Sequence, residues 1–357
     1  MTVQFLPLTS AQMEKIRISR TRTEPKFFLD KFFKRKVQSK SGTILTETLP
    51  DTGRKLAPRS SPLVPGKPIS GPGAVIAAIK PTYLKLTTPV DPGGQVISAA
   101  DDFGVLQGDP AMEHVRERLR INLEHMSRIE RSWEYMAAFA TINGYIDTEY
   151  EGAPQARVDF GRAPDLTVVK TAGTFWGESG VSILDDVQDY KRLMSDAENG
   201  GRAQVMLVGT KVAALMVKAA RKDGELHELM DTRYGVDSSF LRGLRADEPV
   251  NYLGRLSGMI DVYEYDASYE ALDNDGNKVT VRPLAPNEIC LIAQDFEGIR
   301  GFARIEDKAA NYAAIEVFGR NFIMEGSPQR EVVDHQSAPI MIPAEPNKTL
   351  KATVMAA

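Results

Sequence analysis

The sequence predicts an α+β protein in which one long helix is set apart from many short strands. Residues 109–143 keep a three- and four-residue apolar spacing without interruption, which is typical of a single amphipathic helix. Alternating segments at 145–150 and 155–160 flank a Gly-Pro turn, as in a β-hairpin. Residues 46–92 carry nine of the 21 prolines, which excludes a helix in that stretch.

The first 45 residues are predicted to form an N-terminal arm. They contain ten Lys or Arg and three acidic residues, so the arm carries +7 while the rest of the chain carries −11. This asymmetry indicates that the arm binds either nucleic acid or the acidic body of a neighbouring copy. Segment 27–33 (FFLDKFF) also spaces four apolar side chains for one helical face. We expect a neighbouring copy to cover them, because a solvated tail needs no such cluster.

Residues 46–92 are predicted to form an extended loop of two strands that projects from the body. Strand-like pieces occur at 74–79 and 80–86, and they are too apolar for a disordered linker. Such a loop cannot bury its apolar surface on its own body alone. Arm and loop together therefore indicate a subunit that reaches over adjacent copies.

The long helix is predicted to begin at Asp109-Pro110 and to end at Asn143-Gly144. About 34 residues at 1.5 Å each give a rod of roughly 50 Å, which suits a structural spine. His114 and His125 lie on this helix eleven residues apart. No carboxylate–histidine cluster accompanies them, so we expect both to be solvated.

The second half alternates helices and strands. A helix is expected at 184–198, a buried strand at 203–208 and a helix capped by Thr210. Strands at 258–265 and 288–293 are expected to be joined by a hairpin that turns at 273–276.

Residues 335–347, with three prolines, are predicted to form an edge strand, because proline cannot donate to a sheet ladder. We expect its side chains Ile340 and Ile342 to pack on the helix face formed by Leu123, Met126 and Trp133.

Catalytic and metal-binding patterns are missing from the sequence. No apolar run of about 18 residues indicates a membrane span, and no signal-peptide core is visible. The single cysteine, Cys290, lies in an apolar strand and is expected to be buried. Residues 273–278 lack the acidic ligands of a calcium loop, and no phosphate loop, nucleophile elbow or paired metal-ligand spacing occurs. Asp185-Asp186 is expected at a helix start, where acidic residues stabilise the helix dipole, so we do not assign this pair a catalytic role. With none of these patterns present, we predict no cofactor, no metal and no catalytic residue.

Several short motifs resemble those of a known family. The arm carries two apolar pairs, at 28–29 and 32–33, similar to that family's N-terminal pattern. The further matches are, in chain order, 157–162 (RVDFGR), 173–176 (GTFW), Asp185-Asp186, Asp231-Thr232-Arg233, Gly258-Met259, Gly326 with Pro328 and Arg330, 336–339 (QSAP), Ala344 and Pro346. In order and spacing they resemble the lambda-type major capsid (head) proteins of tailed bacteriophages.

The resemblance implies the fold shared by tailed-phage and herpesvirus capsid proteins. On this expectation the chain divides into an N-terminal arm, an extended loop, a peripheral domain with a spine helix and hairpin, an axial domain, and a return to the peripheral domain. The corresponding ranges are 1–45, 46–92, 93–183, 184–320 and 321–357.

The implied function is that of a major capsid protein without catalytic activity. The family builds hexamers and pentamers into an icosahedral shell around double-stranded DNA, with a separate scaffold, a portal and, in some members, a decoration protein. We expect assembly in the host cytoplasm and a final place in the virion. The second hypothesis is a nanocompartment shell of the same fold that encloses protein cargo. The third is a protein that binds nucleic acid through its basic arm, and an enzyme ranks last.

Eight residues of the arm and loop are candidate assembly contacts. They are Arg17, Arg20, Arg22, Phe28, Phe32, Phe33, Tyr83 and Leu84.

Overall fold

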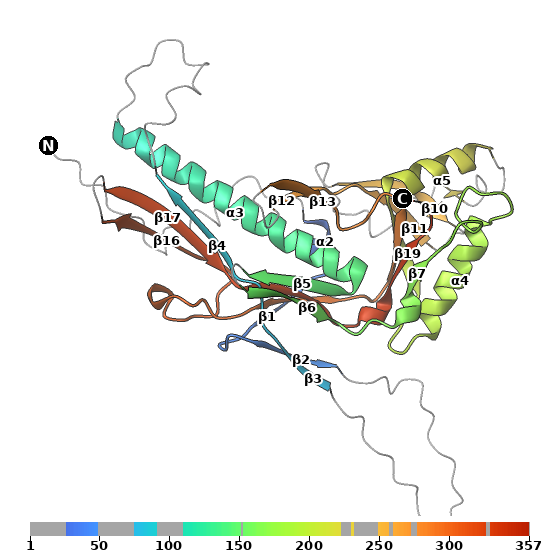
Figure 1. Cartoon of the computed structure of the whole chain (residues 1–357), viewed down its shortest axis with the longest axis horizontal. Coiled ribbons are helices and arrows are strands. Elements are labelled where there is room, and N and C mark those ends of the chain that lie inside the picture. The colour runs from blue at the N-terminus through green and yellow to red at the C-terminus, as the bar shows by residue number, and fades with distance from the viewer. Residues whose placement is uncertain are drawn as a thin grey trace, which may run out of the picture.

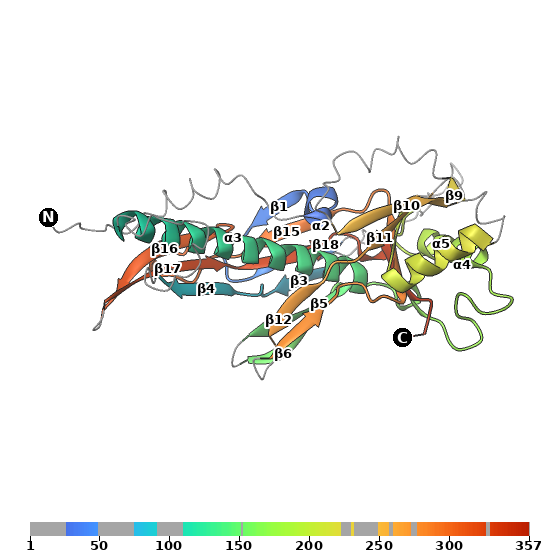
Figure 2. The same cartoon turned by 90° about the horizontal axis from the view of Figure 1, so that it is seen from above.

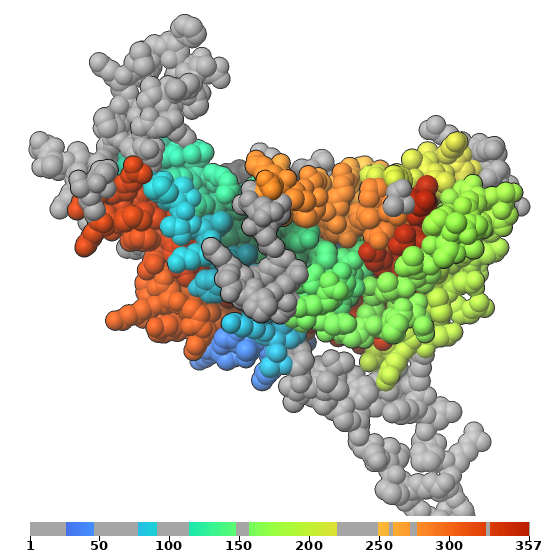
Figure 3. All heavy atoms as spheres, in the orientation of Figure 1, coloured from blue at the N-terminus to red at the C-terminus, as the bar shows by residue number. Residues whose placement is uncertain are grey.

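The computed structural model describes most of the 357-residue chain as one elongated body (Figure 1). The described residues are 26–48, 75–90, 110–150, 153–222, 230–231, 249–256, 260–272, 277–325 and 329–356. The space-filling view shows β16 and β17 (orange-red) at one end and α4 and α5 (green-yellow) at the other (Figure 3). None of the described helices could span a membrane.

Helix α3 (Pro110–Asn143) confirms the predicted 34-residue spine. Its N-terminal half lies along a three-stranded sheet of order β16-β17-β4, as both views show (Figure 2). The strands of this sheet are β16 (Phe318–Met324), β17 (Arg330–Ser337) and β4 (Leu84–Pro89). From Met126 onward the helix contributes Met126, Ile129 and Trp133 to the largest apolar cluster of the described chain.

A seven-stranded sheet lies toward the end of the body that carries α4 and α5, in the order β7-β19-β14-β8-β11-β10-β9 (Figure 1). Val205 and Leu207 of its strand β8 point into the cluster of α3, whereas Met206 and Val208 point into a second cluster with α4 and α5. Apolar layers on both faces explain why the central strands β8 and β14 are nearly continuous apolar runs. The bounds are β7 (Thr167–Val169), β8 (Ala203–Val208), β9 (Met230–Asp231), β10 (Val250–Leu256), β11 (Ile260–Tyr265), β14 (Glu288–Ala293), β19 (Thr349–Thr353), α4 (Ile183–Asp196) and α5 (Thr210–Lys222).

Four smaller sheets contain the remaining described strands. Helix α2 (Phe27–Lys31) leads into a sheet of order β1-β15-β18, and three antiparallel pairs, β2-β3, β5-β6 and β12-β13, complete the described strands. The bounds are β1 (Arg35–Gln38), β15 (Gly298–Phe302), β18 (Pro339–Pro343), β2 (Ile44–Thr48), β3 (Val75–Ile79), β5 (Tyr145–Tyr150), β6 (Ala153–Asp159), β12 (Tyr269–Leu272) and β13 (Lys278–Val281).

Most predicted elements are confirmed. The β5-β6 pair is the expected hairpin, β8 followed by α5 is the expected βα unit, and α4 begins at the expected acidic pair. The loop strand predicted at 74–79 is β3, but it pairs with β2, and the piece predicted at 80–86 leads instead into β4 of the β16-β17-β4 sheet. Residues 49–74 lie outside the described part.

The predicted hairpin between β11 and β14 is confirmed. Strands β12 and β13 pair antiparallel between them in the chain, while β11 and β14 each pair with β8, on opposite sides. The expected turn at 273–276 lies outside the described residues.

The proline-containing segment 335–347 is an edge strand, as predicted, only over β18 (Pro339–Pro343), because residues 335–337 end β17, the middle strand of its sheet. The faces of β18 are also reversed. Strand β18 pairs only with β15, and its Met341 lies in the cluster of Met126 and Trp133. Ile340 and Ile342 point to the other side, into a cluster with Ile44 and Ile79 at the base of the extended loop. Side chains alternate along a strand, so the register differs from the prediction by one residue. Leu123 is 41% exposed and forms no part of the contact.

The C-terminal end of α3 is held by Arg162 of the RVDFGR motif. Its guanidinium donates to the carbonyls of Ile142 (2.7 Å) and Asn143 (2.8 Å), where a helix leaves acceptors unpaired. Gly144 follows with φ +76°, a conformation that favours glycine, and a Cβ there would lie 3.0 Å from Arg162 Nε.

Substitution of Gly144 by alanine is therefore expected to destabilise the subunit by more than the backbone strain alone, which is about 1–2 kcal/mol. Gly161→Ala is the matched control, because Gly161 has φ +78° with no atom within 4 Å of the added Cβ. Urea unfolding of both variants gives the comparison. Equal losses of stability would contradict the close approach of Arg162.

Candidate functional site

The short helix α2 is held at both ends by side chains of other elements. At its start, the Glu134 carboxylate accepts hydrogen bonds from the backbone N–H groups of Phe28 (2.7 Å) and Leu29 (3.1 Å). At its end, the Arg300 guanidinium donates to the carbonyls of Leu29 (2.9 Å) and Phe33. We call this arrangement the α2 clamp. It satisfies the terminal backbone groups that a helix of five residues cannot pair internally.

The aromatic side chains of α2 and of the residues that follow it pack into the main core. Phe28 meets Tyr265 edge-on with ring centroids 5.5 Å apart, and Phe32 meets Phe296 at 5.7 Å. The Phe33 ring lies so close to Gly298 that a Cβ there would come within 2.3 Å of it. Phe28 and Phe33 are fully buried and Phe32 is 8% exposed. A salt bridge of 2.9 Å from Lys26 to Glu130 adds a further tie to α3.

These contacts correct the expectation that a neighbouring copy must cover the phenylalanines. The same chain covers Phe28, Phe32 and Phe33, because α3, β15 and the residues around Tyr265 and Phe296 supply the apolar surface. The segment that precedes this anchor is residues 1–25, and Arg17, Arg20 and Arg22 lie there, outside the described residues.

The other two predicted contacts, Tyr83 and Leu84, lie at the beginning of β4, apart from the clamp. Leu84 is half-buried against the main core. The Tyr83 hydroxyl donates to the Gln336 side chain, and burial, aided by Asp307 and Asp334, raises the pKa of Tyr83.

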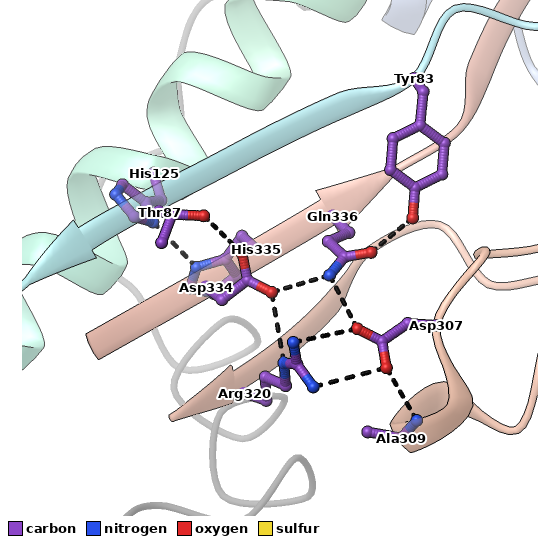
Figure 4. A network of polar contacts seen from close by, with 9 residues as sticks. All are labelled: Tyr83, Thr87, His125, Asp307, Ala309, Arg320, Asp334, His335 and Gln336. Carbon is purple, nitrogen blue, oxygen red and sulfur yellow. Dashed lines mark hydrogen bonds and ion pairs between the residues drawn. The ribbon is translucent and has the colours of Figure 1, made fainter. Parts of the chain in front are cut away.

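Gln336 belongs to a polar network that ties β4, β16 and β17 together (Figure 4). The Asp334 carboxylate accepts from Thr87 (2.8 Å), Gln336 (2.7 Å) and Arg320 (3.3 Å). Asp307 accepts from Gln336 (3.0 Å) and forms a salt bridge with Arg320 (3.1 Å). Burial opposes ionisation of Asp307, yet hydrogen bonds from Ala309 N–H and Gln336, with the charge of Arg320, lower its pKa. Gln336 of the QSAP motif therefore has a structural role in this network.

The GTFW motif and the acidic pair have a structural role as well. Trp176 Nε1 donates to Asp186 (2.6 Å), and Lys170 pairs with the same carboxylate. Ser182 caps α4 by accepting from Asp185 N–H (3.3 Å). These bonds join the loop after β7 to the first turn of α4.

The predicted solvation of the α3 histidines is wrong. His114 lies 3.2 Å from a Glu331 oxygen and is largely buried. His125 is 3% exposed and hydrogen-bonds His335 of β17. The sequence spacing concealed this because the partner residues lie more than 200 positions away.

The chemistry that the described residues can support is limited. Cys290 is buried as predicted, and burial raises the pKa of its thiol to about 12, which makes it a poor nucleophile. Within the described ranges, no three His, Cys, Asp or Glu side chains are grouped so that they could hold a metal ion. The arrangement instead fixes the position of α2, the residues that follow it and the loop base.

Comparison with known proteins gives one consistent relationship. A family model described as phage major capsid protein E matches residues 10–354. The major capsid protein of Escherichia phage lambda is 24% identical over 344 residues, 95% of this chain and 97% of that protein. The major capsid protein of Escherichia phage N15 is 25% identical over 348 residues, with the same two coverages. A crystal structure of a proposed prophage capsid protein from Escherichia coli CFT073 superposes with a TM-score of 0.75 at 20% identity, over 99% of this chain and 100% of that one.

Replacement of Glu134 by glutamine is expected to destabilise the subunit by about 1–3 kcal/mol, because an amide offers only one acceptor oxygen to two buried N–H groups. Glu124→Gln on the same helix is the control. Glu124 is 39% exposed and pairs only with surface arginines, so its loss should cost less than about 0.5 kcal/mol. Urea unfolding at neutral pH measures both. A similar, small loss in the two variants would contradict the α2 clamp.

Proposed function

The chain belongs to the phage major capsid protein E family, and we infer that it is the major capsid protein of a phage head. The observation that carries this conclusion is the family match from residue 10 to residue 354, nearly the whole chain. The superposition with a TM-score of 0.75 supports the tailed-phage capsid fold in addition. Such a protein is a structural component of the virion.

We propose that the subunits assemble into hexamers and pentamers of an icosahedral shell. The α2 clamp supports this proposal, because it fixes the position of the residues that directly follow the basic segment 1–25. That segment holds four basic residues, Lys15, Arg17, Arg20 and Arg22, against two acidic ones, so it is suited to an acidic surface of the next copy. The three arginines remain proposed assembly contacts. Tyr83 and Leu84, where β4 begins beside the base of the extended loop, also remain proposed assembly contacts.

The division into domains remains a proposal. With α2 anchored in the core, the part of the arm available to a neighbour is residues 1–25 rather than 1–45. The loop between β2 and β3 would reach over a second neighbour, while α3 with the β16-β17-β4 sheet would form the peripheral domain. The seven-stranded sheet with α4 and α5 would form the axial domain.

The wider partners follow from the family and are proposed with it. They are a scaffold, a portal, a possible decoration protein and enclosed double-stranded DNA bound without sequence specificity. Assembly would take place in the host cytoplasm, and the chain would need no catalytic activity. A nanocompartment shell with protein cargo is less well supported, because curated relatives that cover 95% of this chain are phage major capsid proteins.

Two truncations test the role of the arm. Removal of residues 2–25 should leave a folded subunit that no longer forms shells, because the α2 clamp and the core stay intact. Removal of residues 2–33 should prevent folding, because it takes the buried aromatic residues with it. Circular dichroism and urea unfolding report folding, and electron microscopy of lysates, with scaffold co-expressed, reports shells.

Normal shells from the 2–25 truncation would show that the arm is dispensable. Absence of shells, tubes and capsomers from the full-length chain with scaffold supplied would contradict the capsid function itself.

A further inference from the structure

A buried pair of histidines joins the spine helix to the sheet beneath it. His125 of α3 and His335 of β17 are each 3% exposed, and their Nδ1 atoms lie 3.1 Å apart. Figure 4 shows the two rings meeting between the helix and the strand. The other nitrogen of His125, Nε2, lies 2.8 Å from the Thr88 hydroxyl of β4. Three elements thus meet at one imidazole pair.

The pair can form its contact only while at least one ring is neutral. Between two Nδ1 atoms at hydrogen-bond distance one must donate and the other accept. If both rings are protonated, both Nδ1 atoms carry hydrogens and no acceptor remains. A first proton is also unfavourable, because the imidazolium would be buried away from water.

Few charged groups near the pair favour protonation of either ring. On α3, Glu124 favours a charged His125 and Arg128 opposes it. On β17, Asp334 favours a charge on either ring, but its carboxylate already accepts from Thr87, Gln336 and Arg320. From β4, the neighbour of the pair is the neutral Thr88. Burial therefore dominates, and it lowers the pKa of both rings, for His335 to about 3.

The two halves of α3 are packed by different forces. From Met126 onward the helix is held by Met126, Ile129 and Trp133 in the main apolar core. Toward the N-terminal end the apolar contact among the described residues is small, with Ile121 of α3 against Val333 and Val90. Polar contacts accompany it, namely the histidine pair and the approach of His114 and Arg118 to Glu331 at 3.2 Å each.

We propose that the His125–His335 pair is an acid-sensitive latch that holds the N-terminal half of α3 on the β16-β17-β4 sheet. At neutral pH the uncharged pair closes the contact. Uptake of protons opens it, and the N-terminal half of the helix separates from the sheet while the aromatic half stays packed. The inference concerns the subunit itself and is independent of its proposed place in a shell.

The direction of the pH effect follows from where the protons bind more tightly. In an opened or unfolded chain a histidine has a pKa of about 6.5, whereas the closed pair has lowered pKa values. The open form therefore binds more protons. The latch keeps its full strength above about pH 6.5 and weakens as the pH falls from there toward about 3. Each proton taken up on opening raises the opening constant about tenfold per pH unit in this window.

Hydrogen exchange of the full-length chain tests the latch directly. A detached half-helix of about 15 residues is marginal in water, so its amides should become exposed when the latch opens. After correction for the chemical exchange rate, peptides covering 114–125 should exchange at least about tenfold faster at pH 5 than at pH 6, and peptides covering 129–143 should not. Equal acceleration along the whole helix, or none, would overturn the proposal.

A double variant removes the titration but keeps a hydrogen bond. In His125→Asn/His335→Asn the amide groups take positions close to those of the two Nδ1 atoms, and an N–H···O bond needs no change of charge. The exchange of 114–125 should then lose its added pH dependence. His114→Gln is the matched control on the same helix, because it leaves the pair intact. Its loss of the Glu331 contact should raise the exchange of 114–125 at both pH values, while the difference between pH 5 and pH 6 stays. An unchanged profile in the double variant overturns the proposal, and if that variant does not fold, the contrast between the two halves of α3 in the wild-type chain decides.

Discussion

The arrangement of the N-terminal region depends on one buried contact, between the Glu134 carboxylate and the first backbone N–H groups of α2. A buried carboxylate needs hydrogen-bond donors, and the first turn of a helix has N–H groups without acceptors, so each satisfies the other. A five-residue helix is not stable alone, and α2 exists because Glu134, Arg300 and the aromatic core hold it. Its position then sets where β1 meets β15 and where the base of the extended loop packs.

Helix α3 combines two kinds of packing along one rod. The part from Met126 onward packs in the core that also includes residues of α2, β8, β14 and β18. It therefore contacts both the N-terminal region and the seven-stranded sheet. The part before Met126 rests on β17, where two of the three positions that meet the helix, Glu331 and His335, are polar and the third is Val333. Buried polar networks of this kind hold a unique arrangement when every member is paired, and they are costly when one partner is lost. The motif residues of the chain belong mainly to such joints rather than to a catalytic centre.

Local patterns predicted the elements well and their partners poorly. The apolar spacing of α3 and the alternation of β5 and β6 are properties of neighbouring residues, so the sequence shows them directly. The burial of FFLDKFF by its own chain was missed, because its acceptor surface comes from residues such as Tyr265 and Phe296, far along the sequence. Glu130 and Glu134, two acids four residues apart beside Trp133 on the apolar face, were the available signal. The His125–His335 pair gave no such signal. One histidine lies on a helix and the other on a strand 210 positions further along, and neither spacing nor composition connects them.

The most direct test of this account is the unfolding free energy of unassembled subunits with Phe33 replaced by alanine. If the aromatic segment belongs to the core of its own subunit, the substitution should cost about 3–5 kcal/mol, as for a large buried aromatic residue. Leu45→Ala, at a side chain that is 69% exposed, gives the baseline and should change the stability by less than about 0.5 kcal/mol. A loss for Phe33→Ala no larger than this baseline would contradict the account and would return the aromatic anchor to a neighbouring copy.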